Sequence, residues 1–164
     1  MNEPPAKRTV VIGVGHRDRA DDGIGPAVVD AIAHRTDQVV TVVREGDLAV
    51  LPLLWEADDD VVIVDAVASP GPAGELVELD VDAFGSGAGL STHGMNVPDA
   101  IGLARRLRCL PARLRVFAVT GQDFGYGAMS RTLHRRVDGL ADQLLNELGI
   151  LPGRASADRG RQAG

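Results

Sequence analysis

The sequence predicts a single-domain α/β fold in which a twisted, mostly parallel sheet carries helices on both faces. Short apolar runs rich in β-branched residues recur along the chain, and amphipathic segments separate them. The apolar runs are continuous, which is typical of strands covered on both faces. A chain of 164 residues suits one hydrophobic core, since domains most often contain roughly 100–150 residues.

The first half of the chain contains three expected strands. The runs 9–14, 39–43 and 61–64 are dominated by Val and Ile, and each is too short for a buried helix. Apolar residues recur every four positions along 23–35, which predicts an amphipathic helix there. A short helix is expected at 48–57.

The second half begins with an edge element. Residues 74–80 alternate apolar and polar side chains after a segment rich in turn formers, as an exposed or edge strand does. A flexible glycine-rich loop is expected at 85–89. The pattern then predicts a helix at 97–107, a buried strand at 114–119 and a long helix at 130–148 with a serine cap.

Composition limits the domain count and the partners. We expect one domain at 9–150, between a flexible N-terminus at 1–8 and a disordered tail at 151–164. No segment has the roughly 20 apolar residues of a membrane span or the core of a secretion signal, so a cytoplasmic protein without membrane contact is expected. The single cysteine, Cys109, fits that compartment. A net charge of -6 without a dense basic tract argues against nucleic-acid binding.

Three residues far apart in the sequence are candidates for one metal-binding cluster: Asp22, Asp65 and His93. Asp22 lies between a strand and a helix, Asp65 follows an apolar run, and His93 precedes a helix. The carboxyl ends of parallel strands share one edge of a sheet, where these residues can meet. Two carboxylates and an imidazole suit nickel or zinc, which can polarise a carbonyl and activate water for amide hydrolysis.

Each candidate also has a structural interpretation. Asp21 is expected to cap the helix that begins near Gly23, and for Asp22 a capping role and a metal-binding role are equally balanced. A turn role for Asp65 is as compatible with the sequence as a chemical one. His93 is flanked by small and polar residues, which disfavours a core role.

The glycines of residues 13–25 do not form a dinucleotide fingerprint. Arg17 and Asp18 stand where the third glycine is required, and the acidic side chains nearby would repel a phosphate. A nucleotide-binding protein is therefore a minor alternative. The glycines are expected to permit a tight turn and close packing of the loop against the helix.

Three separated motifs resemble those of the maturation endopeptidases of nickel-iron hydrogenases. GVGHRDRADDGIGPAVV at 13–29 resembles the glycine loop and acidic pair of that family, VVIVDAV at 61–67 its strand-to-Asp motif, and STHGMN at 91–96 its Ser/Thr-x-His motif. The three occur in the order of the family. Because family members have a five-stranded sheet between helices, the resemblance implies a single-domain three-layer sandwich with a twisted, mostly parallel five-stranded sheet.

The resemblance also implies a site and an activity. In that family the residues matching Asp22, Asp65 and His93 bind metal, so these three are the expected catalytic and metal-binding residues. The expected activity is an aspartyl-type or metallo-endopeptidase that removes the C-terminal extension of a hydrogenase large-subunit precursor after nickel insertion. Nickel is expected to arrive with the precursor, and other divalent metals are expected to substitute in vitro. Whether the metal activates the attacking water or positions the bond for a carboxylate base stays open.

A second function class fits the same fold: a non-catalytic nickel-binding or hydrogenase-assembly chaperone. We expect a monomer in either case. The chain departs from the family at His16, where an asparagine is usual. The substitution has no functional effect, provides an auxiliary metal ligand or indicates an altered specificity, and the first of these is favoured. Asp47 lies in a second departure, at 44–47. A place in the same cleft and a turn role are both considered for it, and the turn role is favoured.

Overall fold

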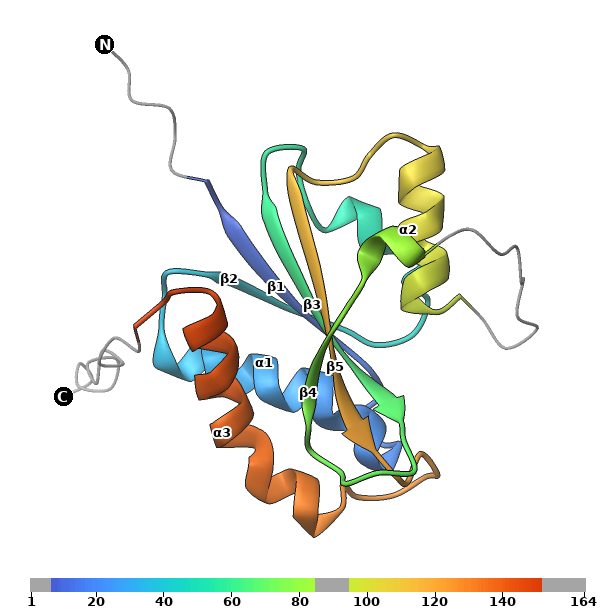
Figure 1. Cartoon of the computed structure of the whole chain (residues 1–164), viewed down its shortest axis with the longest axis vertical. Helices are drawn as coiled ribbons and strands as arrows, with labels where there is room; N and C mark the ends of the chain where they lie inside the picture. The colour runs from blue at the N-terminus through green and yellow to red at the C-terminus, as the bar shows by residue number, and fades with distance from the viewer. Residues whose placement is uncertain (1–6, 85–94, 152–164) are drawn as a thin grey trace, which may run out of the picture.

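A computed structural model describes residues 7–84 and 95–151, and these form one five-stranded sheet between helices (Figure 1). The strand order is β2-β1-β3-β5-β4. Four strands run parallel, and β4 pairs antiparallel with β5 at one edge. The strands are β1 (Thr9–Val14), β2 (Val40–Arg44), β3 (Asp60–Ala68), β4 (Leu76–Leu79) and β5 (Arg113–Gly121).

Helices cover both faces of the sheet (Figure 1). Helices α1 and α3 pack together on one face, while α2 lies on the other beside the 3-10 helix η2. The α-helices are α1 (Ile24–Arg35), α2 (Val97–Arg106) and α3 (Arg131–Glu147). The 3-10 helices are η1 (Ala20–Gly23), η2 (Leu48–Leu53) and η3 (Val81–Ala83).

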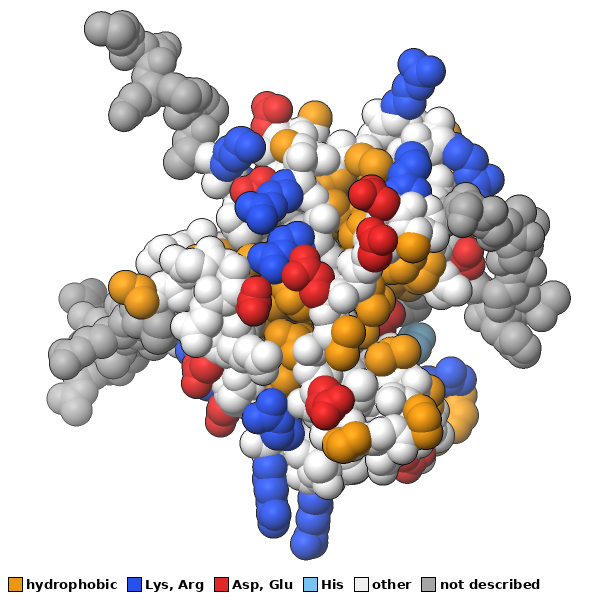
Figure 2. Space-filling view, in the orientation of Figure 1, with side chains coloured by type: hydrophobic (Ala, Val, Ile, Leu, Met, Phe, Trp, Pro, Cys, Tyr) orange, Lys and Arg blue, Asp and Glu red, His pale blue; other side chains and the backbone are white. Residues whose placement is uncertain are grey.

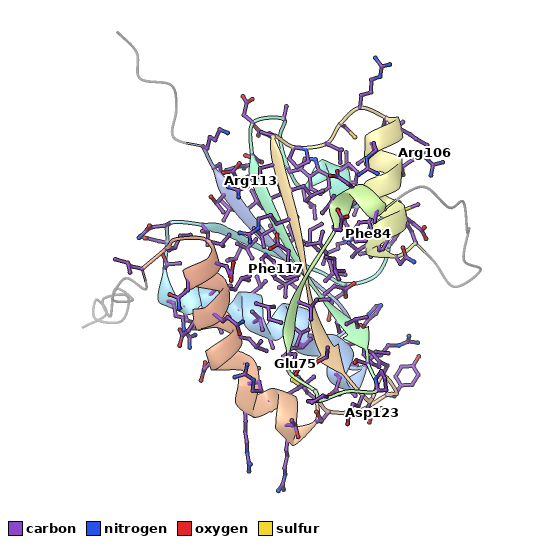
Figure 3. All side chains as sticks on the ribbon, viewed as in Figure 1. Glu75, Phe84, Arg106, Arg113, Phe117 and Asp123 are labelled. Atoms are coloured by element: carbon purple, nitrogen blue, oxygen red, sulfur yellow. The ribbon has the colours of Figure 1, made fainter. Side chains whose placement is uncertain are left out.

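The strands divide the core into two layers, because successive side chains of a strand point to opposite faces. In β3, Val62 and Val64 pack with α1 and α3, whereas Val61 and Ile63 pack with α2 and η2. Phe117 of β5 belongs to the layer of α1 and α3 (Figure 3). Both faces of the inner strands therefore need apolar side chains, which explains their continuous apolar sequences.

Strand β3 is longer than the sequence predicts. Its pairing with β1 ends where Val64 lies opposite Gly13, but its pairing with β5 continues until Ala68 lies opposite Gly121. The sequence predicted that the strand would stop at Asp65, and this prediction was wrong. Asp65 lies opposite Ala118 within the β3–β5 ladder. The apolar run stops at Val64 because only β5 accompanies β3 beyond that point.

The other elements follow the predicted order. The helix expected at 48–57 is a 3-10 helix that contains Pro52 and ends at Leu53, since proline lacks the N–H that a longer α-helix needs at that point. The edge strand is confirmed as β4. The loop expected at 85–89 and most of the expected flexible termini lie outside the described residues.

Charged side chains of both signs are interspersed over the face shown in Figure 2. Ion pairs join neighbouring elements: Arg35 of α1 contacts Asp138 and Asp142 of α3, each at 2.9 Å. Such exposed pairs contribute only about 0–1 kcal/mol each, so apolar burial is the main source of stability. Within the described part of the chain, no helix is both long enough and apolar enough to cross a membrane.

Helix α1 approaches the sheet at a glycine. A Cβ atom on Gly25 would lie 2.5 Å from the carbonyl oxygens of both Val14 and Val64. A Cβ atom on Gly13 would in turn lie 2.6 Å from the carbonyl oxygen of Gly25. Backbone oxygens cannot move aside as a flexible side chain can, so this contact requires glycine. The prediction that these glycines permit close packing of the loop against the helix is confirmed.

Gly25→Ala should lower the free energy of unfolding by about 2–3 kcal/mol, because the added methyl group must push α1 away from two strands at once. Urea denaturation followed by circular dichroism measures this change. Gly71→Ala is the control, since its Cβ atom would meet Ser69 Oγ at an ordinary 3.6 Å. Equal stabilities of the two variants would contradict the importance of the contact.

Candidate functional site

Asp22 is positioned by a tight loop between β1 and α1. Gly15 has a φ of 141°, and a Cβ atom there would lie 1.9 Å from the backbone oxygen of Asp22. Only glycine allows this approach, so the loop folds back onto the end of β1. The backbone N–H of His16 donates to Oδ2 of Asp22 at 2.8 Å. This hydrogen bond holds the carboxylate just beyond β1.

Asp65 reaches the same region from β3. It is one residue past the last pair of the β1–β3 ladder, Gly13 with Val64. Alternation along the strand places its side chain on the face of Val61 and Ile63, the face covered by α2 and η2. Its Oδ1 accepts the N–H of Ala66 at 2.8 Å. The half-buried carboxyl group therefore lies where β1 stops and leaves room beside β3.

The environment makes Asp65 a weak acid. Burial raises the pKa of Asp65 to about 7; the N–H of Ala66 opposes this change, and the nearby charge of Asp22 adds to it. A carboxyl group with a pKa near neutrality can accept and return a proton at working pH. Such shifts are typical of functional sites.

The structure brings Asp22 and Asp65 together in one open cavity of about 520 Å³ at the carboxyl edge of the sheet. The volume lies within the roughly 300–1,000 Å³ of ligand sites. Loops after β1 and β2 and the start of α2 form the rest of its wall. The lining residues are Val14, Gly15, His16, Arg19, Asp22, Arg44, Gly46, Asp47, Leu48, Asp65, Met95 and Asn96.

The third candidate, His93, lies outside the described residues. Met95 and Asn96, which follow it closely in sequence, line the cavity. Asn96 also caps α2, since its side-chain oxygen accepts the N–H of Asp99 at 2.8 Å. Among residues 7–84 and 95–151, no three His, Cys, Asp or Glu side chains lie close enough to hold a metal ion. The described metal-ligand types that line the cavity include the carboxylates of Asp22, Asp47 and Asp65 and the imidazole of His16.

Asp21 does not cap the helix, and that prediction was wrong. Gly23 is the N-cap of α1 and makes no side-chain bond. The carboxylate of Asp21 is buried and accepts the backbone N–H groups of Gln122 at 3.0 Å, Asp123 at 3.1 Å and Ser130 at 3.0 Å. Burial alone would raise the pKa of Asp21, but these hydrogen bonds outweigh it and keep the pKa below its usual value. The residue joins the loop after β1 to the loop after β5.

Two arginines that line the cavity, Arg19 and Arg44, were not among the predicted site residues. Arg44 ends β2, so the edge argument that selected Asp65 could also have selected it. Arg19 lies in the same loop as Asp22. Asp47 has both roles considered for it, because it lines the cavity and its Oδ1 accepts the N–H of Ala49 at the start of η2, at 2.9 Å. The exposed His16 also lines the cavity.

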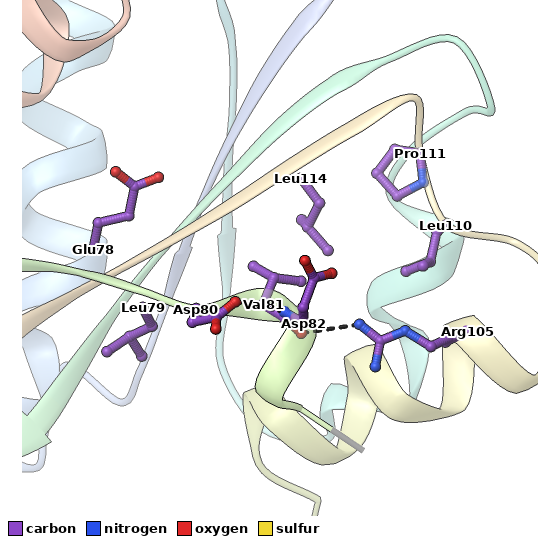
Figure 4. Close-up of a pocket in the computed structure, with 9 residues that line it drawn as sticks. All are labelled: Glu78, Leu79, Asp80, Val81, Asp82, Arg105, Leu110, Pro111 and Leu114. Carbon is purple, nitrogen blue, oxygen red and sulfur yellow. Dashed lines mark hydrogen bonds between the residues drawn. The ribbon is translucent and has the colours of Figure 1, made fainter. Parts of the chain in front are cut away.

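A larger cavity, of about 620 Å³, lies between β4, η3 and the end of α2 (Figure 4). Two of its acidic groups already have partners: Glu78 pairs with Arg115 at 2.8 Å, and Asp80 accepts the N–H of Asp82 at 3.0 Å. Arg105 donates to the carbonyl of Val81 at 2.9 Å, as the dashed line in Figure 4 marks. These bonds stabilise the fold, so the smaller cavity is the better candidate site.

No protein-family model matches the sequence. Among curated proteins, the chain is 28% identical to HupD, a hydrogenase expression/formation protein of Rhodobacter capsulatus, with 87% of this chain and 71% of HupD covered. The solved endopeptidase HybD of Escherichia coli, described as hydrogenase maturating, superposes with a TM-score of 0.69 at 23% identity, covering 87% of this chain and 92% of HybD.

Two further solved structures have a fold similar to that of this chain. The [NiFe] hydrogenase maturation protease HycI of Thermococcus kodakarensis KOD1 has a TM-score of 0.67 at 22% identity, covering 87% of this chain and 93% of HycI. An endopeptidase of Escherichia coli has a TM-score of 0.65 at 25% identity, covering 87% and 94% of the two chains. The chain is therefore similar in sequence to a hydrogenase expression/formation protein and in fold to hydrogenase maturation endopeptidases.

The solved maturation proteases share the three-layer architecture of this chain, so the predicted fold class is confirmed. The similarity to HupD supports the family resemblance that the sequence motifs predicted. The sequence motifs alone led to this family, through residues that two strands and a tight loop bring to one edge. The same edge carries the cavity of about 520 Å³ that contains Asp22 and Asp65, which is called the acidic cavity below. The cavity is therefore the candidate functional site of this chain.

The pKa of Asp65 predicts a pH-dependent stability of the metal-free protein. The folded pKa of about 7 exceeds an unfolded value of ~3.9, so folding takes up a proton between these pH values. The contribution of the Asp65 carboxyl group to the free energy of unfolding is fully present below about pH 4 and is lost as the pH rises through 7. Asp65→Asn removes that loss. With a chelator present, it should therefore stabilise the protein more at pH 8 than at pH 5, by on the order of 2 kcal/mol.

Thermal and urea unfolding at both pH values measure this difference. The exposed Asp37→Asn is the control, because no burial opposes its charge. An Asp65→Asn effect of the same size at pH 5 and pH 8 would contradict the raised pKa.

Asp21→Asn should destabilise the fold by about 2–3 kcal/mol at neutral pH, because an amide has one acceptor oxygen where three backbone N–H groups converge. The pKa of Asp21 is lowered, so its stabilising effect is present above the unfolded value of ~3.9 and is lost as pH falls through the folded value. The difference from the wild type should accordingly shrink below pH 4. Asp18→Asn, in the same loop, is the matched control, and a similar loss there would argue against a specific role for Asp21.

Proposed function

We propose that this protein is an endopeptidase that removes the C-terminal extension of a hydrogenase large-subunit precursor. The names of its relatives supply the reaction class, since HybD and HycI are described as a maturating endopeptidase and a maturation protease. The single observation that carries the proposal is the convergence of Asp22 and Asp65 in one cavity, with the pKa of Asp65 raised to about 7.

Peptide hydrolysis needs an attacking water, a group that takes its proton and a way to return that proton to the leaving amine. Asp65 fits the proton-transfer role, since a carboxylate with a pKa near 7 can take the proton as the oxygen of water attacks the scissile carbonyl carbon. When the C–N bond breaks, the same carboxyl group can give the proton to the departing nitrogen. Asp22 is fixed by the N–H of His16 and supplies a charge that keeps the pKa of Asp65 high.

Nickel enters this proposal as part of the precursor. Asp22 and Asp65 fit a divalent ion, because a cation between two carboxylates relieves their mutual repulsion. His93 is proposed as the third ligand. Met95 lines the cavity, and His93 precedes it by only two residues, a stretch of chain that spans at most roughly 7 Å. A metal held there would polarise the scissile carbonyl and lower the pKa of water.

Asp22→Asn, Asp65→Asn and His93→Ala should each lower kcat/KM for cleavage of nickel-loaded precursor by about a hundredfold or more, because each removes a ligand or the proton acceptor. Mass spectrometry of the precursor before and after incubation measures the loss of its C-terminal extension. Asp18→Asn should retain activity, since Asp18 shares the loop but does not line the cavity. Full activity of the His93 variant would remove it from the site.

Experiments with the protein, nickel and the precursor also distinguish a peptidase from a nickel chaperone. Calorimetric titration should show weak nickel binding by the protein alone and tighter binding when precursor supplies further ligands. A chaperone would instead hold nickel tightly by itself and leave the precursor uncut. Intact precursor after prolonged incubation with wild-type protein and nickel would overturn the peptidase assignment.

A further inference from the structure

The acidic cavity also contains two arginines from separate loops. Arg19 lies between β1 and α1, and Arg44 is the last residue of β2. Each therefore follows a strand that ends at the edge where Asp22 and Asp65 lie. A peptide bound over the two aspartates would pass beside guanidinium groups as well as carboxylates.

The side chain of Arg19 is held in place at the rim. Its Nη2 donates to the hydroxyl of Tyr126 at 3.3 Å, and its guanidinium carbon lies 5.1 Å from the centre of that ring. The backbones of Arg19 and Gly127 form an isolated β-bridge, which fixes the two loops relative to each other. Tyr126 is 85% exposed, so the pair stands at the surface where a partner can contact it. A prepositioned cation loses less entropy on binding than a free one.

Arg44 is also oriented by its surroundings. Its Nε donates to the backbone oxygen of Asp47 at 3.1 Å, in the turn that leads into η2. That bond uses one nitrogen of the guanidinium, which has further N–H groups to offer. The side chain is half-buried against the cavity.

The carboxylates of the cavity bind backbone N–H groups instead of these arginines. Asp22 accepts from His16, and Asp65 accepts from Ala66. Asp47 likewise accepts the N–H of Ala49. Within the described ranges, neither Arg19 nor Arg44 forms an ion pair with a carboxylate.

A nearby arginine differs from Arg19 and Arg44 because it pairs with a carboxylate of the protein. Arg17, two residues before Arg19, pairs with Asp30 at 2.7 Å and does not line the cavity. The loop therefore contains one arginine with an internal partner and one that faces the proposed peptide site. A guanidinium in such a site pairs best with a planar anion that accepts two parallel hydrogen bonds, which is a carboxylate.

We propose that Arg19 and Arg44 bind a carboxylate of the precursor close to its scissile bond, either an acidic side chain or the C-terminal carboxylate of the extension. This inference rests on the proposed function, because the arginines share a cavity with the proposed catalytic aspartates. The arginines select the peptide by its charge, while Asp22 and Asp65 act on the bond. Arg19 and Arg44 are thus specificity-determining residues.

The test measures KM and kcat of Arg19→Gln and Arg44→Gln on nickel-loaded precursor. Each substitution should raise KM about tenfold or more and change kcat less, because one charge-assisted contact to the peptide is lost. Arg17→Gln is the matched control and should leave both constants near their wild-type values. Circular dichroism and thermal unfolding verify that every variant is folded, and Arg19→Lys, which keeps the charge, should recover part of the affinity.

Two changes in the precursor identify the source of the carboxylate. In one, the acidic residues of the extension become Asn or Gln. In the other, a Gly-Ser-Gly segment is added at the C-terminus, which moves the terminal carboxylate away by roughly 10 Å. For the precursor that lacks the bound carboxylate, wild-type enzyme and the Arg19 variant should have the same KM. This loss of the difference is the expected double-mutant signature.

The outcomes separate this inference from the proposed function. Failure of the wild-type protein to cut any precursor would overturn the proposed function itself. Normal cleavage with unchanged KM in both arginine variants would overturn the inference alone. A loss that stays equal for all precursors would also overturn it, since the effect of Arg19 would then not depend on either carboxylate of the precursor.

Discussion

The contact between the start of helix α1 and the ends of two strands is the constraint on which the rest of the site depends. Gly25 brings the helix against the carbonyl oxygens of Val14 and Val64 with no room for a side chain. The chain must then turn sharply between β1 and α1, and Gly15 makes that turn possible. The carboxylate of Asp22 is consequently held over the end of β1, beside Asp65. A wider separation of helix and sheet would move the two acids apart and weaken the repulsion that helps keep the pKa of Asp65 high.

Asp21 and Asp65, which lie on different elements, show how hydrogen bonding separates a structural carboxylate from a chemical one. Asp21 is fully enclosed and has three backbone N–H donors, so it stays ionised and binds the loop after β5. Asp65 is also withdrawn from water, but it has a single N–H donor, from Ala66, and a negative neighbour. The number of donors decides whether burial produces a stable anion or a group that exchanges protons near neutral pH. Burial alone would not distinguish the two.

The sequence was sufficient to predict the layer order, the five strands and the meeting of Asp22 with Asp65, because these follow from local apolar patterns and from the shared edge of parallel strands. It could not predict the role of Asp21, whose three donors lie more than 100 residues later in the chain. The end of β3 was also misplaced, since pairing with β5 continues the strand after the apolar run has stopped. Pro52 was visible in the sequence, but its neighbours had the spacing of a helix, and the missing N–H limited that helix to a 3-10 turn.

The arginines of the cavity escaped the sequence argument for a different reason. Loops tolerate charged residues in many roles, so Arg17, Arg19 and Arg44 are equivalent until their partners are known. The structure separates them by what each guanidinium already binds: Arg17 has the carboxylate of Asp30, whereas Arg19 has a tyrosine hydroxyl and Arg44 a backbone oxygen. Neutral partners orient a guanidinium without neutralising it, which leaves its charge available to an incoming anion. An acidic site with oriented cations at its border can therefore bind metal through one set of groups and a negatively charged peptide through the other.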